Sequence, residues 1–379
     1  MKKNVYLMFF IAFLQALVFY YPVLTLYRQA FGITLWQMSV LEAICLIITA
    51  VFEFPWGILA DHIGLKKTLI LANFFYFLSK VIFWRAESFD LFLLERIVLG
   101  IACAGVSGCD SSILYCSSGE KDADRNFSIY SALATAGLLS VSAAYSLVLS
   151  RFPMKLTSTL TMFSYLISLL LTFMLDEVKD LGSTKMKSDK MESLGKQLLQ
   201  KKNLLLFSSC SRVVLEIARV VCVVFAQVLL ISSGLTKMGL GGYVFLLTLC
   251  GYAGLYSYRV RNRQLYFAAA YMLCGILVLS CSVLKQPVII ALFLLIVEAL
   301  IHVCSPLISL TEQNYVFPKY RASMISFFSA VSNALCIVVS LGLGAASAMN
   351  IRTAYLIAGI MIIALGAAIL YFYRNVIKT

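Results

Sequence analysis

The stretch Gly57–Lys67, which reads GILADHIGLKK, decides how the rest of this chain is interpreted. It is a short polar segment between two long apolar runs, so an apolar helix has to end, turn and restart within about ten residues. Its two glycines permit a tight turn. Its two final lysines favour the cytoplasmic side of a membrane. The segment therefore predicts a cytoplasmic turn between two membrane-spanning helices.

The composition of the whole chain is that of a membrane protein. Of its 379 residues, 61% are hydrophobic and only 13% are charged. A soluble domain of this length needs a more strongly charged surface, and apolar stretches of about 20 residues are typical of transmembrane helices. The alternating ten-residue segments of membrane barrels are absent from the sequence. The sequence therefore predicts an all-α membrane protein.

The apolar stretches predict twelve transmembrane helices. The first is too long for a signal-peptide core and is followed by no small-residue cleavage site, so it counts as a span. The predicted spans are Val5–Tyr27, Gln37–Leu59, Thr68–Ala86, Leu91–Cys116, Phe127–Ser150, Leu156–Leu175, Leu204–Ile231, Leu240–Tyr258, Gln264–Leu284, Val288–Thr311, Ala322–Met349 and Ala354–Tyr373.

The longest polar stretch, Asp176–Lys202, separates the first six spans from the last six. Its charges, serines and weak apolar periodicity predict a cytoplasmic linker. We therefore expect an N-terminal six-helix bundle over residues 1–175, the linker over 176–202 and a C-terminal six-helix bundle over 203–379. Two bundles joined by a tether are typical of transporters built from repeats.

The formal net charge of +13 orients the protein in the membrane. With the N-terminus inside, the loops on the cytoplasmic side carry 20 of the 31 Lys and Arg residues, the outer loops, Arg28 included, carry seven and the spans four. This bias predicts a multi-pass protein of the cell membrane with both termini in the cytoplasm. The basic loops are expected to contact anionic lipid head groups. The sequence contains no patch of basic residues interleaved with aromatic ones, so nucleic-acid binding is not expected.

The eleven cysteines are scattered, nearly all within spans, and form no CxxC pair or metal-spaced Cys/His cluster. They are interpreted as small packing residues, so we expect neither a metal nor a cofactor. HExxH, nucleophile-elbow and phosphate-loop motifs are also absent from the sequence, which argues against an enzyme.

The polar turn and the fourth span resemble the major facilitator superfamily. The family signature Gly-x-Leu-Ala-Asp-Arg-x-Gly-Arg-Arg/Lys-Arg/Lys is matched in order by Gly57, Leu59, Ala60, Asp61, Gly64, Lys66 and Lys67, with His62 in place of a basic residue. A second family pattern, Arg-xxx-Gly-xxx-Ala, fits Arg96, Gly100 and Ala104. The resemblance implies a monomeric carrier with two six-helix halves around a central cavity that opens alternately to each side.

The same resemblance implies a cytoplasmic gate. Asp61 with Lys66 and Lys67 would hold the two halves together, and Glu53 could belong to this gate. The alternative for the two lysines is that they only anchor the topology.

Ionisable side chains inside the C-terminal spans are candidates for the transport site, because each is costly in the bilayer. Arg212, Glu216 and Arg219 share one helical face, and an ionised Glu216 between two arginines is expected there. Glu298 and His302 lie one turn apart and could exchange a proton. The alternatives are a structural ion-pair ladder for the first set and a neutral, hydrogen-bonded histidine for the second.

The N-terminal half offers a further set of candidates. Glu42 lies in the second span, on the same helical face as Glu53. Arg96 and Asp110 of the fourth span face a similar direction but lie about 21 Å apart along one helix. Lys80, near a helix end, is expected to reach the interface with its ammonium group. The cavity candidates of the first span are Gln15 and Tyr20, whereas Tyr27 and Trp36 are assigned to the interfacial aromatic belt.

The mixed charge of these candidates favours a small amphiphilic or zwitterionic organic solute, moved by a proton-coupled secondary transporter. Export by antiport is expected from the resemblance alone, although Ala132–Tyr145 lacks the proline of the drug/proton exporter signature. Proton-coupled uptake of a nutrient and a non-transporting receptor on the same fold are the alternatives.

Overall fold

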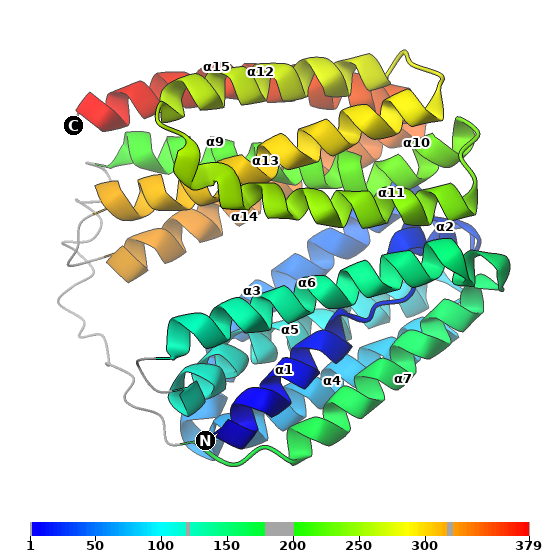
Figure 1. Cartoon of the computed structure of the whole chain (residues 1–379), viewed down its shortest axis with the longest axis vertical. Coiled ribbons are helices and arrows are strands. Elements are labelled where there is room, and N and C mark those ends of the chain that lie inside the picture. The colour runs from blue at the N-terminus through cyan, green and yellow to red at the C-terminus, as the bar shows by residue number, and fades with distance from the viewer. Residues whose placement is uncertain (1, 119–121, 179–200, 317–320, 379) are drawn as a thin grey trace. The chain divides into compact units, whose positions relative to one another are not determined.

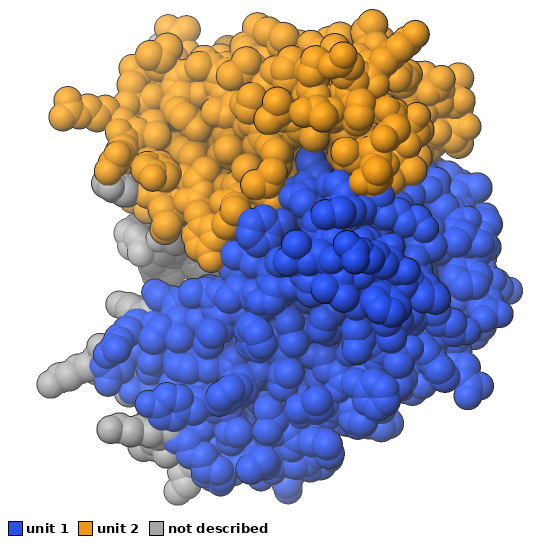
Figure 2. All heavy atoms as spheres, turned by 45° about the vertical axis from the view of Figure 1, so that its right-hand side comes forward, with its two compact units in different colours: residues 1–184, 237–245 blue, residues 185–236, 246–379 orange. Residues whose placement is uncertain are grey.

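The protein is helical throughout the residues that its computed structural model describes, which are 2–118, 122–178, 201–316 and 321–378. Its contacts divide the chain into two compact units, shown in separate colours in Figure 2. The first contains Met1–Thr184 and Lys237–Phe245, and the second contains Lys185–Thr236 and Leu246–Thr379. The segment Lys237–Phe245 groups with the first unit, a detail that the sequence does not predict.

Figure 1 shows the helices of both units. The elements before the polar stretch are α1 (Lys2–Ala16), η1 (Tyr21–Val23), α2 (Leu24–Gln29), α3 (Leu35–Ile63), α4 (Leu65–Arg85), α5 (Phe89–Ser118), α6 (Ala123–Leu147), η2 (Leu149–Arg151) and α7 (Met154–Phe173). Those after it are α9 (Lys202–Arg219), η4 (Val220–Phe225), α10 (Ala226–Ser232), α11 (Lys237–Cys250), η5 (Gly251–Arg259), α12 (Arg263–Cys281), α13 (Pro287–Tyr315), α14 (Arg321–Met349) and α15 (Ile351–Lys378).

The helices have the length and composition of membrane spans. Eleven helical stretches within the described residues are long and apolar enough to cross a membrane. The remaining predicted span, Leu91–Cys116, falls within the 30-residue helix α5. Large apolar side chains such as Phe54 on α3 and Leu265 on α12 are exposed, as expected for surfaces that meet lipid. The prediction of an all-α membrane protein is confirmed, whereas most of the predicted linker lies in 179–200, outside the described residues.

The first predicted span is not one continuous helix. Helix α1, which lies between α6 and α7 in Figure 1, ends at Ala16, and the chain re-enters helical structure only at Tyr21–Val23. Side chains of α7 satisfy the backbone groups freed by this break. The Phe19 N–H donates to Thr161 Oγ1 at 2.9 Å, and the Tyr165 hydroxyl donates to the Gln15 carbonyl at 2.7 Å. Pro22 lacks an N–H group, which helps to explain why the helix does not continue.

The seventh predicted span is continuous but changes its winding. Between α9 and α10, the six residues of η4 form a π-helical segment. The Tyr355 hydroxyl of α15 donates to the Val221 carbonyl at 2.6 Å within this segment. π-Helical segments inside longer helices are frequent at functional sites.

The start of α1 is fastened to the chain that follows α7. Asn4 Nδ2 donates to the Asp176 carbonyl, and the Asp176 N–H donates to Asn4 Oδ1, both at 2.9 Å. Lys3 Nζ also donates to Asp176 Oδ1 at 3.0 Å, and this hydrogen bond lowers the pKa of the Asp176 carboxyl. The charged contact is therefore present at neutral pH and is lost as the pH falls through that lowered pKa.

The close packing of α5 against α3 depends on Gly100. A Cβ atom at this position would lie 2.8 Å from the Cys45 carbonyl oxygen, which belongs to the backbone and cannot turn away. We expect Gly100→Ala to lower the free energy of unfolding by about 1–3 kcal/mol, because the helices have to separate. Thermal unfolding of the purified protein in detergent measures the effect. Gly342→Ala on α14 is the control, since nothing lies within 4 Å of that position. Equal melting temperatures of the two variants would contradict the prediction.

Candidate functional site

Four charged side chains meet inside the first unit and form what we call the charge square. Arg28 comes from α2, Glu42 from α3, and Glu95 and Arg96 from α5. Glu42 lies 3.4 Å from Arg28 and 3.3 Å from Arg96. Glu95 lies 3.0 Å from Arg96 and 3.8 Å from Arg28. Each carboxylate therefore contacts both arginines, and the square is neutral when all four groups are ionised.

The corners of the charge square differ in how far the protein encloses them. Glu95 is 0% exposed and Arg28 is 2% exposed, whereas the Glu42 side chain is 29% exposed. The buried carboxylate of Glu95 is held by ion pairs alone, because its oxygens accept no hydrogen bond of good geometry from any described residue. Removing a buried charge from its partners is expensive in a low-dielectric interior. Glu42 is thus the corner of the charge square that the protein encloses least.

The sequence analysis named two corners of the charge square as candidates, Glu42 and Arg96. It counted Arg28 among the outer loops, yet the structure buries this side chain, and it did not single out Glu95. Consecutive residues such as Glu95 and Arg96 point about 100° apart on a helix, so their ion pair is not visible in a periodicity argument. One signal in the sequence could have indicated the charge square. Charged residues occur near the start of both the second and the fourth predicted spans.

Lys80 does not reach the interface, so that expectation is wrong. The side chain is 5% exposed and its ammonium donates to the Tyr20 hydroxyl at 3.3 Å. It also lies 4.8 Å from the centre of the Tyr165 ring and 5.2 Å from that of Tyr76. Tyrosine rings and hydroxyls stabilise a cation where lipid and water are absent. Tyr20 is therefore part of the enclosure around Lys80.

Gln15 lies in a hydrogen-bonded chain across three helices. Its Nε2 donates to Asn73 Oδ1 of α4 at 2.9 Å, and Asn73 Nδ2 donates to Thr172 Oγ1 of α7 at 2.8 Å. Tyr27, assigned to the interfacial belt from the sequence, is 1% exposed and its hydroxyl lies 3.4 Å from Ser158 Oγ. That assignment is wrong, because α2 turns the ring into the bundle, whereas Trp36 is exposed as expected.

Asp110 lies far along α5 from the charge square. Its carboxylate accepts hydrogen bonds from the Tyr130 hydroxyl of α6 at 3.0 Å and from the Ser111 N–H at 2.6 Å. It forms no ion pair within the described residues, as its distance from Arg96 along the helix predicts. The side chains of Ser107 and Gly108 lie outside the described part of the chain.

A turn forms within the predicted polar segment, but it is confined to Gly64. The expectation that Gly57 also forms part of the turn is wrong, because this residue lies inside helix α3. Helix α3 ends at Ile63, Gly64 has a φ of 91°, and α4 begins at Leu65. The Glu177 carboxylate accepts the Lys66 backbone N–H at 3.1 Å, which satisfies a free donor of the first turn of α4. Glu53, Gly57 and Lys67 are exposed, and the Asp61 side chain lies outside the part that the structure describes.

In the second unit, Arg212 pairs with a residue that the sequence did not single out. Its guanidinium donates three hydrogen bonds to Glu312 of α13, from Nη2 to Oε2 at 2.9 Å and to Oε1 at 3.1 Å, and from Nε to Oε1 at 3.2 Å. The Ser208 hydroxyl also donates to Glu312 Oε1. The expectation that Glu216 lies between two arginines is therefore wrong. Glu216 pairs with Arg219 at 2.6 Å and accepts the Ser340 hydroxyl of α14 at 2.8 Å.

Glu298 and His302 come together as predicted, with 3.1 Å between Oε1 and Nε2. The pair lies beside η5, where the helical path tightens to a 3₁₀ form over Gly251–Arg259. A Cβ atom at Gly254 would lie 3.0 Å from the His302 carbonyl oxygen, so this glycine allows the two segments to approach closely. Glu298 also interacts with the buried thiol of Cys222 in η4. The pair is thus surrounded by two segments with irregular winding.

Buried ionisable groups inside bundles of membrane-spanning helices are typical of transporters that couple solute movement to ions. Comparison with known families supports a transporter. The chain belongs to the Major Facilitator Superfamily, whose model matches residues 5–340. A transporter is thus a better description of this protein than an enzyme.

One curated relative is described as "Probable 4-methylmuconolactone transporter" from Cupriavidus pinatubonensis. It is 32% identical over 92 residues, which cover 24% of this chain and 21% of the relative. The match thus spans about a fifth of that relative's length.

Several solved transporters share the fold. The nucleoside transporter NupG superposes with a TM-score of 0.79 at 14% identity, covering 98% of this chain and 99% of its own. The D-xylose-proton symporter gives 0.74 at 12% identity over 98% of each chain. A bacterial homologue of the human lysosomal transporter Spinster gives 0.71 at 14% identity, covering 99% and 96%. At these identities the likeness establishes the fold alone.

Proposed function

We propose that this protein is a proton-coupled secondary transporter of a small amphiphilic organic solute. The observation that carries the proposal is the charge square, a neutral set of four ionisable groups with one partly exposed corner, Glu42. Such a set is costly to bury and offers a place for one proton at a time.

Protonation of Glu42 changes the balance of the charge square. A neutral Glu42 leaves two arginines facing the single carboxylate of Glu95, so the cluster acquires one positive charge. This uncompensated positive charge is costly in the protein interior. Its cost is removed when Glu42 loses its proton again or when an anionic group approaches the two arginines. This dependence of the local charge on one proton is what coupling to a pH gradient requires.

The second unit supplies another proton-binding pair. Glu298 and His302 lie at hydrogen-bond distance, and the ordinary histidine pKa falls between pH 5 and 8. We expect Glu298→Gln to lower pH-gradient-driven solute transport at least about tenfold and to flatten its pH profile over that range. Transport into proteoliposomes at a series of pH values measures this, with the exposed Glu87→Gln as control. A wild-type profile in Glu298→Gln would exclude the pair from coupling.

Export by antiport is the proposed direction. Uptake is the second candidate, because a D-xylose-proton symporter is among the structurally similar proteins. Inside-out vesicles with an imposed pH gradient separate the two: solute accumulation on acidification of the lumen supports antiport. A solute panel should include 4-methylmuconolactone, the solute in the name of the curated relative.

The remaining expectations from the sequence are kept as proposals. Both termini and the 176–202 linker are assigned to the cytoplasm, and Glu53, Gly57, Asp61, Gly64, Lys66 and Lys67 are assigned to the cytoplasmic gate. The cavity is assigned to Gln15, Tyr20, Arg96, Asp110, Arg212, Glu216, Arg219, Glu298 and His302. The protein is proposed to act as a monomer in the cell membrane.

A further inference from the structure

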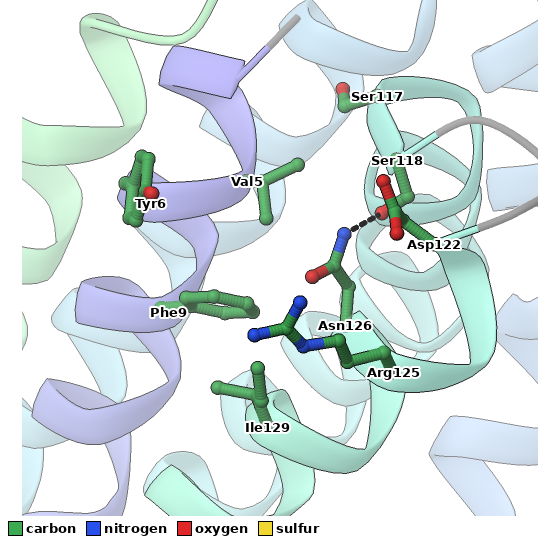
Figure 3. A pocket seen from close by; sticks show the side chains of 9 residues that line it. All are labelled: Val5, Tyr6, Phe9, Ser117, Ser118, Asp122, Arg125, Asn126 and Ile129. Carbon is green, nitrogen blue, oxygen red and sulfur yellow. Dashed lines mark hydrogen bonds between the residues drawn. The ribbon is translucent and has the colours of Figure 1, made fainter.

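A pocket of about 570 Å³ lies within the first unit, between the start of α1 and the facing ends of α5 and α6 (Figure 3). Its apolar wall includes Val5 and Phe9 of α1 and Ile129 of α6. Its polar end includes Ser118, Asp122 and Arg125. The pocket is therefore lined by both apolar and charged side chains. The transport site proposed above uses none of these residues.

The pocket lies at the start of a helical stretch that is long and apolar enough to span a membrane. Val5 and Phe9 lie in the first two turns of α1, within about 10 Å of the helix start. A head-group layer is about 5–7 Å thick on each side of the hydrocarbon core. Tyr6 also lines the pocket, and its side chain is 62% exposed on this membrane-spanning helix. The pocket thus lies beside an apolar surface suited to lipid.

Two charges at the polar end are available to a ligand. Asn126 Nδ2 already donates to Ser118 Oγ at 2.9 Å, and Ser117 Oγ accepts from Asn4 Nδ2 at 3.4 Å. By contrast, the side chains of Arg125 and Asp122 form no hydrogen bond or ion pair with another described residue. In Figure 3 the Arg125 guanidinium lies near Phe9 and Asn126, within the pocket.

We propose that this pocket binds one phospholipid whose head group carries both a phosphate and a primary ammonium. The guanidinium of Arg125 matches the phosphate, because its planar fork donates two parallel hydrogen bonds to an oxyanion. The carboxylate of Asp122 matches the ammonium. Val5, Phe9 and Ile129 contact the start of the acyl chains. A group with only one sign of charge leaves one of the two side chains without a partner.

Native mass spectrometry of the purified full-length protein tests the proposal. The protein is mixed in detergent with phosphatidylethanolamine, phosphatidylglycerol or phosphatidylcholine, and the fraction retaining lipid is measured. We expect preferred retention of phosphatidylethanolamine. Arg125→Gln should lower its retention about tenfold, as expected for the loss of one charge-assisted contact. Asp122→Asn should lower retention of phosphatidylethanolamine but not of phosphatidylglycerol.

The control is Arg151→Gln, which removes an exposed arginine on η2 without touching the pocket. Unchanged lipid retention in Arg125→Gln, or equal loss in Arg151→Gln, would overturn the proposal. Displacement of the lipid by millimolar inorganic phosphate would also overturn it, since it would identify a site for free anions. All variants are first compared by circular dichroism and gel filtration, so that a misfolded variant is recognised. Lipid retention is measured without a transport assay, so its failure would leave the proposed transport function standing.

Discussion

Glu42→Gln is expected to reduce pH-gradient-driven transport at least about 100-fold while solute exchange without a gradient continues. Glutamine keeps the size and hydrogen-bonding capacity of the side chain but cannot carry the proton. Glu42 is the only corner of the charge square with substantial exposure, and it contacts both Arg28 and Arg96. The other carboxylate, Glu95, is fully enclosed and cannot replace it.

Two assays with the same reconstituted protein measure this effect. Accumulation of solute under an imposed pH gradient reports coupling, and counterflow of labelled against unlabelled solute reports exchange. Glu87→Gln is the matched control, since Glu87 forms only an exposed pair with Lys155 at 3.2 Å. Gradient-driven accumulation at the wild-type rate in Glu42→Gln would show that the charge square is structural.

Glu312→Gln is expected to have the largest effect on stability. Glu312 is buried and accepts three hydrogen bonds from Arg212 as well as one from Ser208. Removing one partner of a buried ion pair leaves the other charge without compensation, which costs about 3–5 kcal/mol. Arg212 is 28% exposed, so water can reach part of its guanidinium, and we expect the lower end of that range. Thermal unfolding in detergent measures the loss.

A double substitution distinguishes the electrostatic contribution of the ion pair from the contribution of side-chain packing. Arg212→Met together with Glu312→Leu removes both charges and keeps apolar bulk between α9 and α13. Replacing both partners of a buried pair is often neutral or stabilising. The double variant should therefore unfold at a higher temperature than Glu312→Gln. If it is as unstable as the single variant, the interaction between Arg212 and Glu312 is not the source of the loss.

The fold could be predicted because it depends on the order of apolar and polar stretches along the chain. Apolar runs of about 20 residues have to become helices in lipid, where every backbone N–H and C=O needs an internal partner. The turn at Gly64 was found for the same reason. The break after Ala16 was not found, since its backbone groups are satisfied by Thr161 and Tyr165 from a distant helix.

The pairs within one helix were partly predictable. Glu298 and His302, one turn apart, contact each other as expected. The same argument from helical spacing placed Glu216 between Arg212 and Arg219. In the structure, Arg212 instead binds both carboxylate oxygens of Glu312 on another helix. Helical spacing predicts which residues share a face of one helix. It does not predict which side chain of a neighbouring helix will bind a residue on that face.

The amino-acid sequence by itself determined the class of protein, most of its helices and the turn at Gly64. The reason is that an apolar segment in lipid has to form its backbone hydrogen bonds internally and therefore becomes a helix. Only the packing of helices determined that Arg28, Glu42, Glu95 and Arg96 meet, and that Lys80 lies among tyrosines. These contacts act over a few ångströms between residues that are up to 85 positions apart in the sequence, such as Lys80 and Tyr165, and such proximity exists only after the bundle has folded.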